Sequence, residues 1–338
     1  MKNSFKILIS VICLVGCEPN TIEISQNPYT DWARNHPGLQ VANLPEKKGN
    51  WQTRFYPLDK ERLETLGDVN AIDGITEVPR PTSDFKTYET RLIRVAEILP
   101  NPVKKILEKY LYGIYFVQGL GSTGLTGIVR GKNKEPLGGI LFLDTDYLQK
   151  PINDWATEKD GSAFQTHESL SLKLSEENSN IQTLKFIILH ELGHILATVL
   201  NHAPDYSETY RDYRKFPIFE GVWITETISP YDQTFFPERN SIRFYKKHAN
   251  TKLFPDGYNI YKKLKNTSFV SLYAATNADD TYAEAFAQYV TVVLEKEDYI
   301  VKINANGKEE EILKNPILLE GGRRFRILFE KVVVENKN

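Results

Sequence analysis

The amino-acid sequence predicts an α+β fold in which a small mixed sheet packs on one long apolar helix and a mainly helical part follows. Three observations support this prediction. Three short apolar segments with the spacing of strands lie between residues 112 and 144. Residues 184–200, LKFIILHELGHILATVL, are nearly all apolar and have the length of a buried helix. An aromatic-rich stretch at 201–271 and a second apolar helix after residue 277 then follow.

Local patterns along the chain predict the individual elements. Apolar residues at helical spacing alternate with β-branched and aromatic runs, so helices are expected at 88–100 and 102–111, and strands at 112–118, 126–130 and 138–144. The glycine-rich GLGSTGLTG after the first strand lacks the GK[ST] ending of a phosphate-binding loop, and we interpret it as a hairpin or mobile loop. RRFRILFEKVVVE at 323–335 fits a last helix or strand.

Length and composition set wide limits. The chain has 338 residues, enough for one large domain or two small ones, and we expect one domain at 54–338. Within it, the sheet and the apolar helix would occupy about 85–202, and the helical part about 203–338. With 42 basic and 44 acidic residues the net charge is −2, so the bulk charge gives no reason to expect a nucleic-acid partner.

The first residues have the pattern of an export signal. MKNSFKILISVICLVGC combines two lysines, a short apolar run and small residues before Cys17. Its end resembles the cleavage box of bacterial lipoproteins, so we expect residues 1–16 to be removed and Cys17 to carry a lipid anchor that binds the membrane. The alternative is a plain signal peptide cut elsewhere. Residues 17–53 would then be a lipidated tether and a loose N-terminal arm.

The long apolar helix carries three ionisable residues, His190, Glu191 and His194. Residues i and i+4 share one helix face, so the two imidazoles project side by side and can bind one metal ion. Glu191 points about 100° away from His190 and can hydrogen-bond a metal-bound water without being a ligand. This H-E-x-x-H spacing is typical of a zinc pair with a general base. The alternative is a buried helix whose histidines bond local carbonyls.

A catalytic zinc usually has three protein ligands and one open position, so a third ligand is needed. His202 and His167 are weak candidates, because the longer motif with a third histidine would place it at 200, where this chain has Leu200. A carboxylate remains, and Asp280 and Glu284 stand at i and i+4 on one helix face. One would bind the metal and the other would accept the N–H of a ligand histidine. A solvated acidic face is the alternative.

Capping and small residues indicate how these two helices begin and pack. Ser179 or Asn180 can cap the first helix, and Asn277 or Asp279 can cap the second. Gly193 is a weak helix former in the middle of the first helix. We therefore expect another segment to pack close to the backbone at that glycine.

HELGH together with YAATNADDTYAEAF at 273–286 resembles the zincin superfamily, and within it the gluzincin-like group that includes the catalytic domain of anthrax lethal factor. The segment also resembles exported lipoprotein zinc metallopeptidases of bacteria. The resemblance covers about residues 184–202 and 268–292 and implies a zincin-like fold and a zinc metallopeptidase activity. It also implies an exported lipoprotein of the cell envelope, at the outer membrane or cell surface rather than the inner membrane.

The resemblance implies a role for each matching residue. Zn²⁺ would be held by His190 and His194, the ligand glutamate of the family falls on Asp280, its second carboxylate on Glu284, and its active-site tyrosine on Tyr273. Aspartate is one methylene shorter than the family's glutamate, so the two helices must approach more closely. Asp280 and Glu284 therefore both stay open as third ligand, with Asp280 preferred.

The expected activity is hydrolysis of a peptide bond in a peptide or protein substrate. Glu191 would act as general base on a zinc-activated water, and the Tyr273 hydroxyl would stabilise the oxyanion. The substrate strand could pair with an exposed edge strand, expected at 138–144. Two alternatives stay open: a surface-anchored binding lipoprotein with a structural or degenerate zinc site, and a zinc hydrolase that acts on something other than a peptide.

Overall fold

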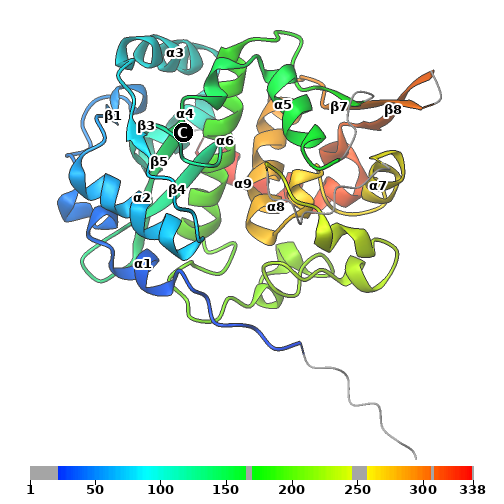
Figure 1. The fold of residues 1–338 in the computed structure, drawn as a ribbon, viewed down its shortest axis with the longest axis horizontal. Coiled ribbons are helices and arrows are strands. Elements are labelled where there is room, and N and C mark those ends of the chain that lie inside the picture. The colour runs from blue at the N-terminus through cyan, green and yellow to red at the C-terminus, as the bar shows by residue number, and fades with distance from the viewer. Residues whose placement is uncertain (1–21, 165–169, 246–256, 306–307, 337–338) are drawn as a thin grey trace, which may run out of the picture.

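The helix with the histidine motif, α6 (Asn180–Val199), runs through the middle of the molecule in the computed structural model (Figure 1). The structure describes residues 22–164, 170–245, 257–305 and 308–336. A mixed five-stranded sheet lies on one side of α6, and α8 (Ala278–Gln288) lies on the other. The fold is therefore mixed α+β with a helical C-terminal region, as the sequence predicted.

The main sheet contains the three predicted strands and two short additional ones. The strands are β1 (Phe55–Tyr56), β2 (Arg80–Pro81), β3 (Leu111–Gln118), β4 (Gly124–Arg130) and β5 (Pro136–Asp144). Their order is β1-β3-β5-β4, with β2 on β3; β3 and β5 are parallel, and β4 is antiparallel to β5. The sheet is therefore mixed, as predicted.

The prediction that 138–144 is an edge strand is wrong, because β5 lies between β3 and β4. The chain leaves β3 through residues 119–123, and only then forms the hairpin of β4 and β5. Residues 119–123 of the glycine-rich stretch thus form a loop rather than a hairpin turn, with Gly119 and Gly121 at φ +74° and +79°, and its last four residues begin β4. β4 is instead an edge strand. Among the described residues, the only β-pairing on its outer side is one isolated bridge between Gln40 and Arg130.

The helices that were predicted from periodicity are present. Described residues form α1 (Thr30–Asn35), α2 (Lys60–Ile72), α3 (Phe85–Ile98), α4 (Asn101–Tyr110), α5 (Ile152–Gly161), α6, α7 (Gly257–Leu264), α8 and α9 (Arg323–Glu335). α3 and α4 match the helices expected at 88–100 and 102–111, and 323–335 is a helix rather than a strand. A π-helical segment, Tyr289–Leu294, continues α8.

The chain between α6 and α7 differs from the expected helical subdomain. Its described part, residues 200–245, contains only short 3-10 turns, three of which begin at prolines 217, 230 and 237. Proline fixes φ and lacks an N–H, so it starts a turn readily but does not continue a helix. Several of its aromatic side chains are nevertheless part of the core: Tyr213, Phe219, Trp223 and Phe236 are buried, whereas Tyr210 and Phe235 are exposed.

A second, antiparallel sheet was not predicted. It contains β6 (Leu170–Lys173), β7 (Ile300–Ala305) and β8 (Lys308–Lys314) in that order. The exposed half of β8 is a run of charged residues without the alternation of a half-buried strand, which explains why no strand was expected there.

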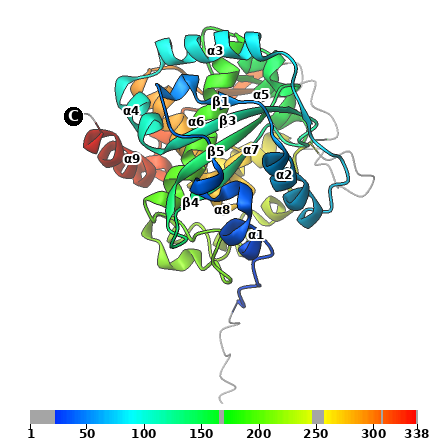
Figure 2. The same cartoon turned by 90° about the vertical axis from the view of Figure 1, so that its left-hand side faces the viewer.

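The N-terminal arm is packed rather than loose over its described part. Alternate residues of β5 face two separate cores, and Ile140 and Phe142 pack against Leu39 of the arm and Leu66 of α2. Trp51 is also buried. Figure 2 shows α1 and α2 in front of the sheet, on the side away from α8. A sheet that is apolar on both faces must be covered on both, and the arm supplies part of that cover.

The signal peptide expected at 1–16 and Cys17 lie outside the described residues. Within the described part of the chain, no helix has both the length and the apolar character needed to cross a membrane.

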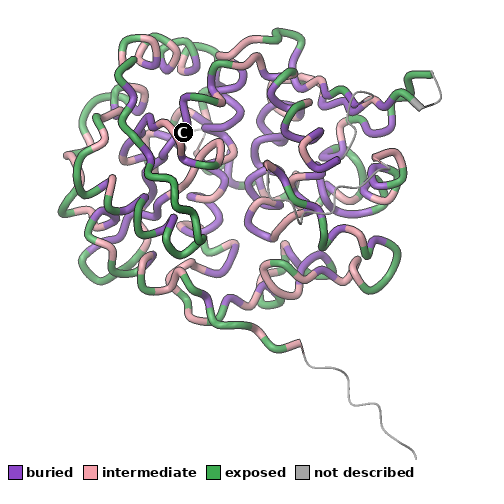
Figure 3. Tube along the Cα trace, in the orientation of Figure 1, coloured by how far each residue is buried: buried purple, intermediate pink, exposed green. Residues whose placement is uncertain are grey.

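α6 and α8 meet at Gly193, and most residues of both helices are buried. Figure 3 shows how buried residues are distributed along the chain. A Cβ atom on Gly193 would lie 2.6 Å from the Cα atom of Ala283 and 3.2 Å from its Cβ atom. The close approach expected at this glycine is therefore present, and its partner is the backbone of α8. This contact sets the distance between the two helices that carry the candidate site.

We expect Gly193→Ala to lower the free energy of unfolding by about 1–2 kcal/mol. Overpacking costs about 1–3 kcal/mol and exceeds the roughly 0.5–1 kcal/mol that alanine gains over glycine in a helix. Gly67→Ala in α2 is the matched control, because nothing lies within 4 Å of its added Cβ atom, and it should stabilise the protein. Urea unfolding measures both variants; stabilisation by both would contradict the tight contact.

Candidate metal centre

Two helix caps position the candidate ligands. The Ser179 side chain accepts a hydrogen bond from the backbone N–H of Gln182 at the start of α6. Asn277 caps α8, and its side-chain oxygen accepts from the N–H of Asp280 at 2.8 Å. One of the two caps predicted for each helix is therefore used. With α6 and α8 in contact at Gly193, the first turn of α8 faces the histidines of α6.

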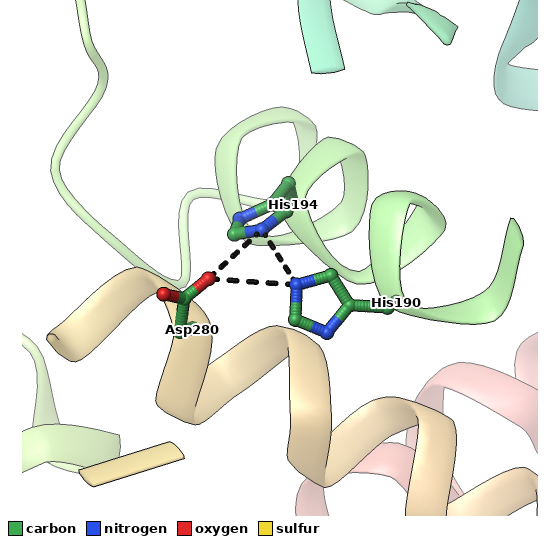
Figure 4. Close-up of side chains that lie close together, drawn as sticks. All are labelled: His190, His194 and Asp280. Atoms are coloured by element: carbon green, nitrogen blue, oxygen red, sulfur yellow. Dashed lines mark hydrogen bonds and ion pairs between the residues drawn. The ribbon is translucent and has the colours of Figure 1, made fainter. Parts of the chain in front are cut away.

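His190, His194 and Asp280 converge on one point (Figure 4). Their nearest ligand atoms form a triangle: His190 Nε2 lies 3.2 Å from His194 Nε2 and 3.4 Å from Asp280 Oδ1, and His194 Nε2 lies 3.5 Å from the same oxygen. Bonds of about 2.0–2.1 Å to a tetrahedral zinc place ligand atoms about 3.3 Å apart. The donor types and the spacing therefore fit a metal ion with three protein ligands.

The charged groups around His190, His194 and Asp280 favour a positive charge between them. Burial by itself lowers the pKa of His190, but hydrogen bonds to Asp280 and Glu284 outweigh it and raise that pKa to about 10. Burial also opposes ionisation of Asp280, yet hydrogen bonds and charge from His190 and His194 hold its pKa well below the usual range. An imidazole surrounded by carboxylates in this way stabilises a cation, which is either a proton or a metal ion.

Glu284 lies on the other side of His190. Its Oε1 atom is 3.4 Å from His190 Nδ1, the nitrogen that faces away from the triangle, and its Oε2 atom accepts from Ser271 Oγ at 2.9 Å. In this arrangement Asp280 occupies the ligand position, and Glu284 orients the ring of His190. The buried Lys159 lies 3.3 Å from Glu284 Oε1, and together with His190 it lowers the pKa of Glu284 to about 2 despite burial.

No pattern in the sequence pointed to Lys159. It is a buried lysine near the end of α5, 5% exposed, and only the tertiary fold places its ammonium group beside Glu284 and 4.5 Å from the centre of the Tyr273 ring. A lysine is rarely buried without a partner. Here the ammonium keeps the orienting carboxylate ionised, so it belongs to the centre although it touches none of the three candidate ligands.

Glu191 lies next to the triangle but outside it. Its side chain is 5% exposed and lines the same cavity as the two histidines and Asp280. The Thr126 hydroxyl donates to Glu191 Oε2 at 2.7 Å, which fixes the carboxylate against the edge strand β4. Gly124 leaves room for it, since a Cβ atom there would lie 2.5 Å from Glu191 Oε1. Glu191 is thus placed to take a proton from a molecule in the cavity.

Tyr273 also lines this cavity, from the 3-10 turn Tyr273–Ala275 before α8. Its ring centre is 5.8 Å from that of His190. The negative charge of Asp280 and burial raise the pKa of Tyr273 well above its ordinary value. The hydroxyl therefore keeps its proton at neutral pH and can donate a hydrogen bond.

Two other candidates lie elsewhere. His202 Nδ1 is 2.7 Å from the Tyr282 hydroxyl and does not join the triangle. Asp279, the alternative cap, instead accepts hydrogen bonds from Arg211 and Tyr213, each at 2.9 Å, and so anchors α8. His167 lies outside the described residues.

A cleft gives access to the triangle. The cavity that contains His190, Glu191, His194 and Asp280 has a volume of about 230 Å³ and runs along β4. A smaller cavity of about 30 Å³ lies toward the start of β4, beside Lys159. The arrangement can therefore hold a metal ion at a point that opens onto a cavity.

No protein-family model matches this chain, and no curated protein and no solved structure is significantly similar to it.

Proposed function

We propose that this protein is a zinc-dependent hydrolase of the zincin type that cleaves peptide bonds. The observation that carries the proposal is the triangle of His190, His194 and Asp280 with Glu191 beside it in one open cavity. A metal pair alone would be compatible with a structural site. A carboxylate that lines the cleft next to three ligand atoms, without being one of them, is the arrangement that metal-assisted hydrolysis requires.

His190, His194 and Asp280 would hold the zinc ion. When bound, zinc polarises the scissile carbonyl and lowers the pKa of water toward neutrality. Glu191 takes the proton from the attacking water and returns it to the leaving amine, while Thr126 holds its carboxylate in place. The protonated Tyr273 hydroxyl donates a hydrogen bond to the developing oxyanion.

The substrate would bind as an extended strand against β4, which replaces 138–144 as the candidate edge. We propose antiparallel pairing, so the substrate runs opposite to β4. Its residues before the scissile bond then lie toward Ile128, and those after it lie toward Ser122. Because Gly124 and Thr126 contact Glu191, the scissile bond would lie at their level.

The geometry of the site distinguishes the proposal from only one of the two alternatives. A structural zinc site uses four protein ligands. Among the described residues only three ligand atoms converge, and a cavity opens onto them, which favours the hydrolase. A hydrolase of non-peptide amides would use the same residues, so only substrates separate it from a peptidase. We also keep the proposal of an exported lipoprotein, tethered to the cell envelope through Cys17.

Cleavage of a peptide library by the purified mature protein tests the proposal. We expect cleavage with zinc, loss of cleavage with a chelator, and recovery when zinc is added back, because the three ligands alone supply no electrophile. Products identified by mass spectrometry give the cleaved positions. If the zinc-loaded protein instead leaves every peptide intact and cleaves amide bonds in cell-wall fragments, that result would replace the peptidase proposal with the hypothesis of a hydrolase that acts on non-peptide amides.

A further inference from the structure

The lining of the cleft extends beyond the residues of the metal centre. Beyond Ile128, its lining includes Tyr29 and Trp32 from the N-terminal arm, Asp73 after the end of α2, and Tyr206 and Glu226 from the segment that follows α6. The cavity is continuous from these residues to Glu191 and Asp280. The outer part of the cleft is therefore built by three segments that lie far apart in the chain.

Aromatic faces form one side of this outer part. The rings of Tyr29 and Tyr206 meet edge to face, with 6.2 Å between their centres, and Trp32 lies near them on α1 with its ring nitrogen bonded to the Thr65 carbonyl at 3.1 Å. Arg211 already stacks on Tyr206, 3.8 Å from its ring centre. Aromatic faces of this kind attract cations, guanidinium and ammonium groups alike.

Two carboxylates complete the outer part. Asp73 accepts a hydrogen bond from the Tyr29 hydroxyl, and Glu226 is paired with Arg211 at 2.9 Å while its side chain stays 37% exposed. Burial, Asp73 and Glu226 together raise the pKa of Tyr29, which places both carboxylates near that ring. Among the described residues that line the cavity there is no lysine and no arginine. Arg211 is shared between Glu226 and Asp279, so the outer part stays negative, and it is aromatic.

The arm is fixed in its position at the cleft. The Asn27 side chain donates to the Tyr206 carbonyl at 2.7 Å and to the Glu208 carbonyl at 3.1 Å, and its backbone N–H donates to the Thr209 carbonyl at 2.8 Å. Arg34 also donates to the Ser207 carbonyl at 2.8 Å. These bonds join the arm to the segment after α6, so the wall is preformed and needs no ordering when a ligand binds.

From these contacts we infer that the outer part of the cleft is a specificity pocket for a lysine or arginine side chain, located on the amino side of the scissile bond. This inference rests on the proposed peptidase function and names its substrate class: polypeptides with a basic residue one to three positions before the cleaved bond. The alkyl stem packs on Tyr29, Trp32 and Tyr206, and the cationic group lies between Asp73 and Glu226. The position follows from antiparallel pairing with β4, since Ile128 lies on that side of Glu191.

Matched peptides test the pocket. Starting from a sequence cleaved in the library, each position before the bond is filled with lysine or with norleucine, which has the stem without the charge. We expect kcat/KM to be about tenfold higher for lysine at one of these positions, and the preference to shrink as salt is raised. In the double variant Asp73→Asn/Glu226→Gln the two peptides should be cleaved equally. Glu64→Gln removes a carboxylate from the exposed face of α2 and should leave the preference intact.

Binding separates this inference from the proposed function. The zinc-loaded Glu191→Gln variant is titrated calorimetrically with the lysine and norleucine peptides, with and without the Asp73→Asn/Glu226→Gln changes. Tighter lysine binding that the double change removes supports the pocket even if no peptide is ever hydrolysed. Hydrolysis without a preference for lysine would contradict the specificity pocket but not the proposed peptidase activity. A preference for lysine only at positions after the cleaved bond would contradict the location of the pocket on the amino side of that bond. Circular dichroism of the double variant, matched to the unmodified protein, shows that the fold is kept.

Discussion

Glu191→Gln is expected to bind zinc like the unmodified protein while its kcat falls by about 10²–10⁴-fold, the usual contribution of a general base. Glutamine has the same shape, and Thr126 can still donate to the amide oxygen as it does to Glu191 Oε2. The three ligand atoms do not include Glu191. The change therefore removes proton transfer and little else.

Zinc titration and single-turnover hydrolysis of one library peptide measure the two effects separately. Glu64→Gln is the control for loss of a carboxylate away from the cleft. Full activity in Glu191→Gln would exclude Glu191 as the base. A parallel loss of zinc and of activity would instead mean that Glu191 holds the metal, and the arrangement around Thr126 would have to change on metal binding.

Asp280→Ala is expected to weaken zinc binding by more than about 100-fold and to abolish hydrolysis, because it removes one of three ligands. Loss of an orienting partner such as Glu284 typically costs about 10–100-fold in affinity, so Glu284→Gln should be the milder change. Competition with a chelating dye measures both affinities. The reverse order would make Glu284 the third ligand, the alternative that the sequence left open.

The comparison of Asp280→Ala with Glu284→Gln needs a control for loss of stability in Glu284→Gln. Glu284→Gln removes the nearer carboxylate from the buried ammonium of Lys159 and leaves Asp160, 4.0 Å away, as its charged partner, so we expect a loss of stability below the roughly 3–5 kcal/mol that breaking a buried ion pair costs. The double variant Lys159→Met/Glu284→Gln removes both charges and should recover stability. Its zinc affinity should still lie between those of the unmodified protein and Asp280→Ala. A thermal melt with and without zinc reports the stability and the metal binding together.

Local patterns predicted the elements that carry the site. The i, i+4 spacing of His190 and His194, and of Asp280 and Glu284, identified the candidate ligands because a helix places such residues on one face. Gly193 predicted a close contact, and Ser179 and Asn277 were among the expected caps. These features depend on residues a few positions apart.

The errors arose where the outcome depends on distant segments. The strand at 138–144 was correctly found and wrongly placed at the edge, because strand order is set by which strand folds back on which. The arm looked loose because it is polar and rich in proline, yet Leu39 fills a core that only the second face of the sheet creates. Lys159 had no local signal at all, since its partner lies on α8.

Residue spacing was enough to place two imidazoles on one helix face with a carboxylate beside them, and two acids on a second helix. The spacing could not tell which acid meets the imidazoles. In the folded chain Asp280 completes the triangle, Glu284 faces the other nitrogen of His190, and Lys159 lies behind Glu284. Asp73 and Glu226 open onto the same cleft. Helix geometry sets which side chains share a face, whereas packing between remote apolar surfaces sets which faces meet.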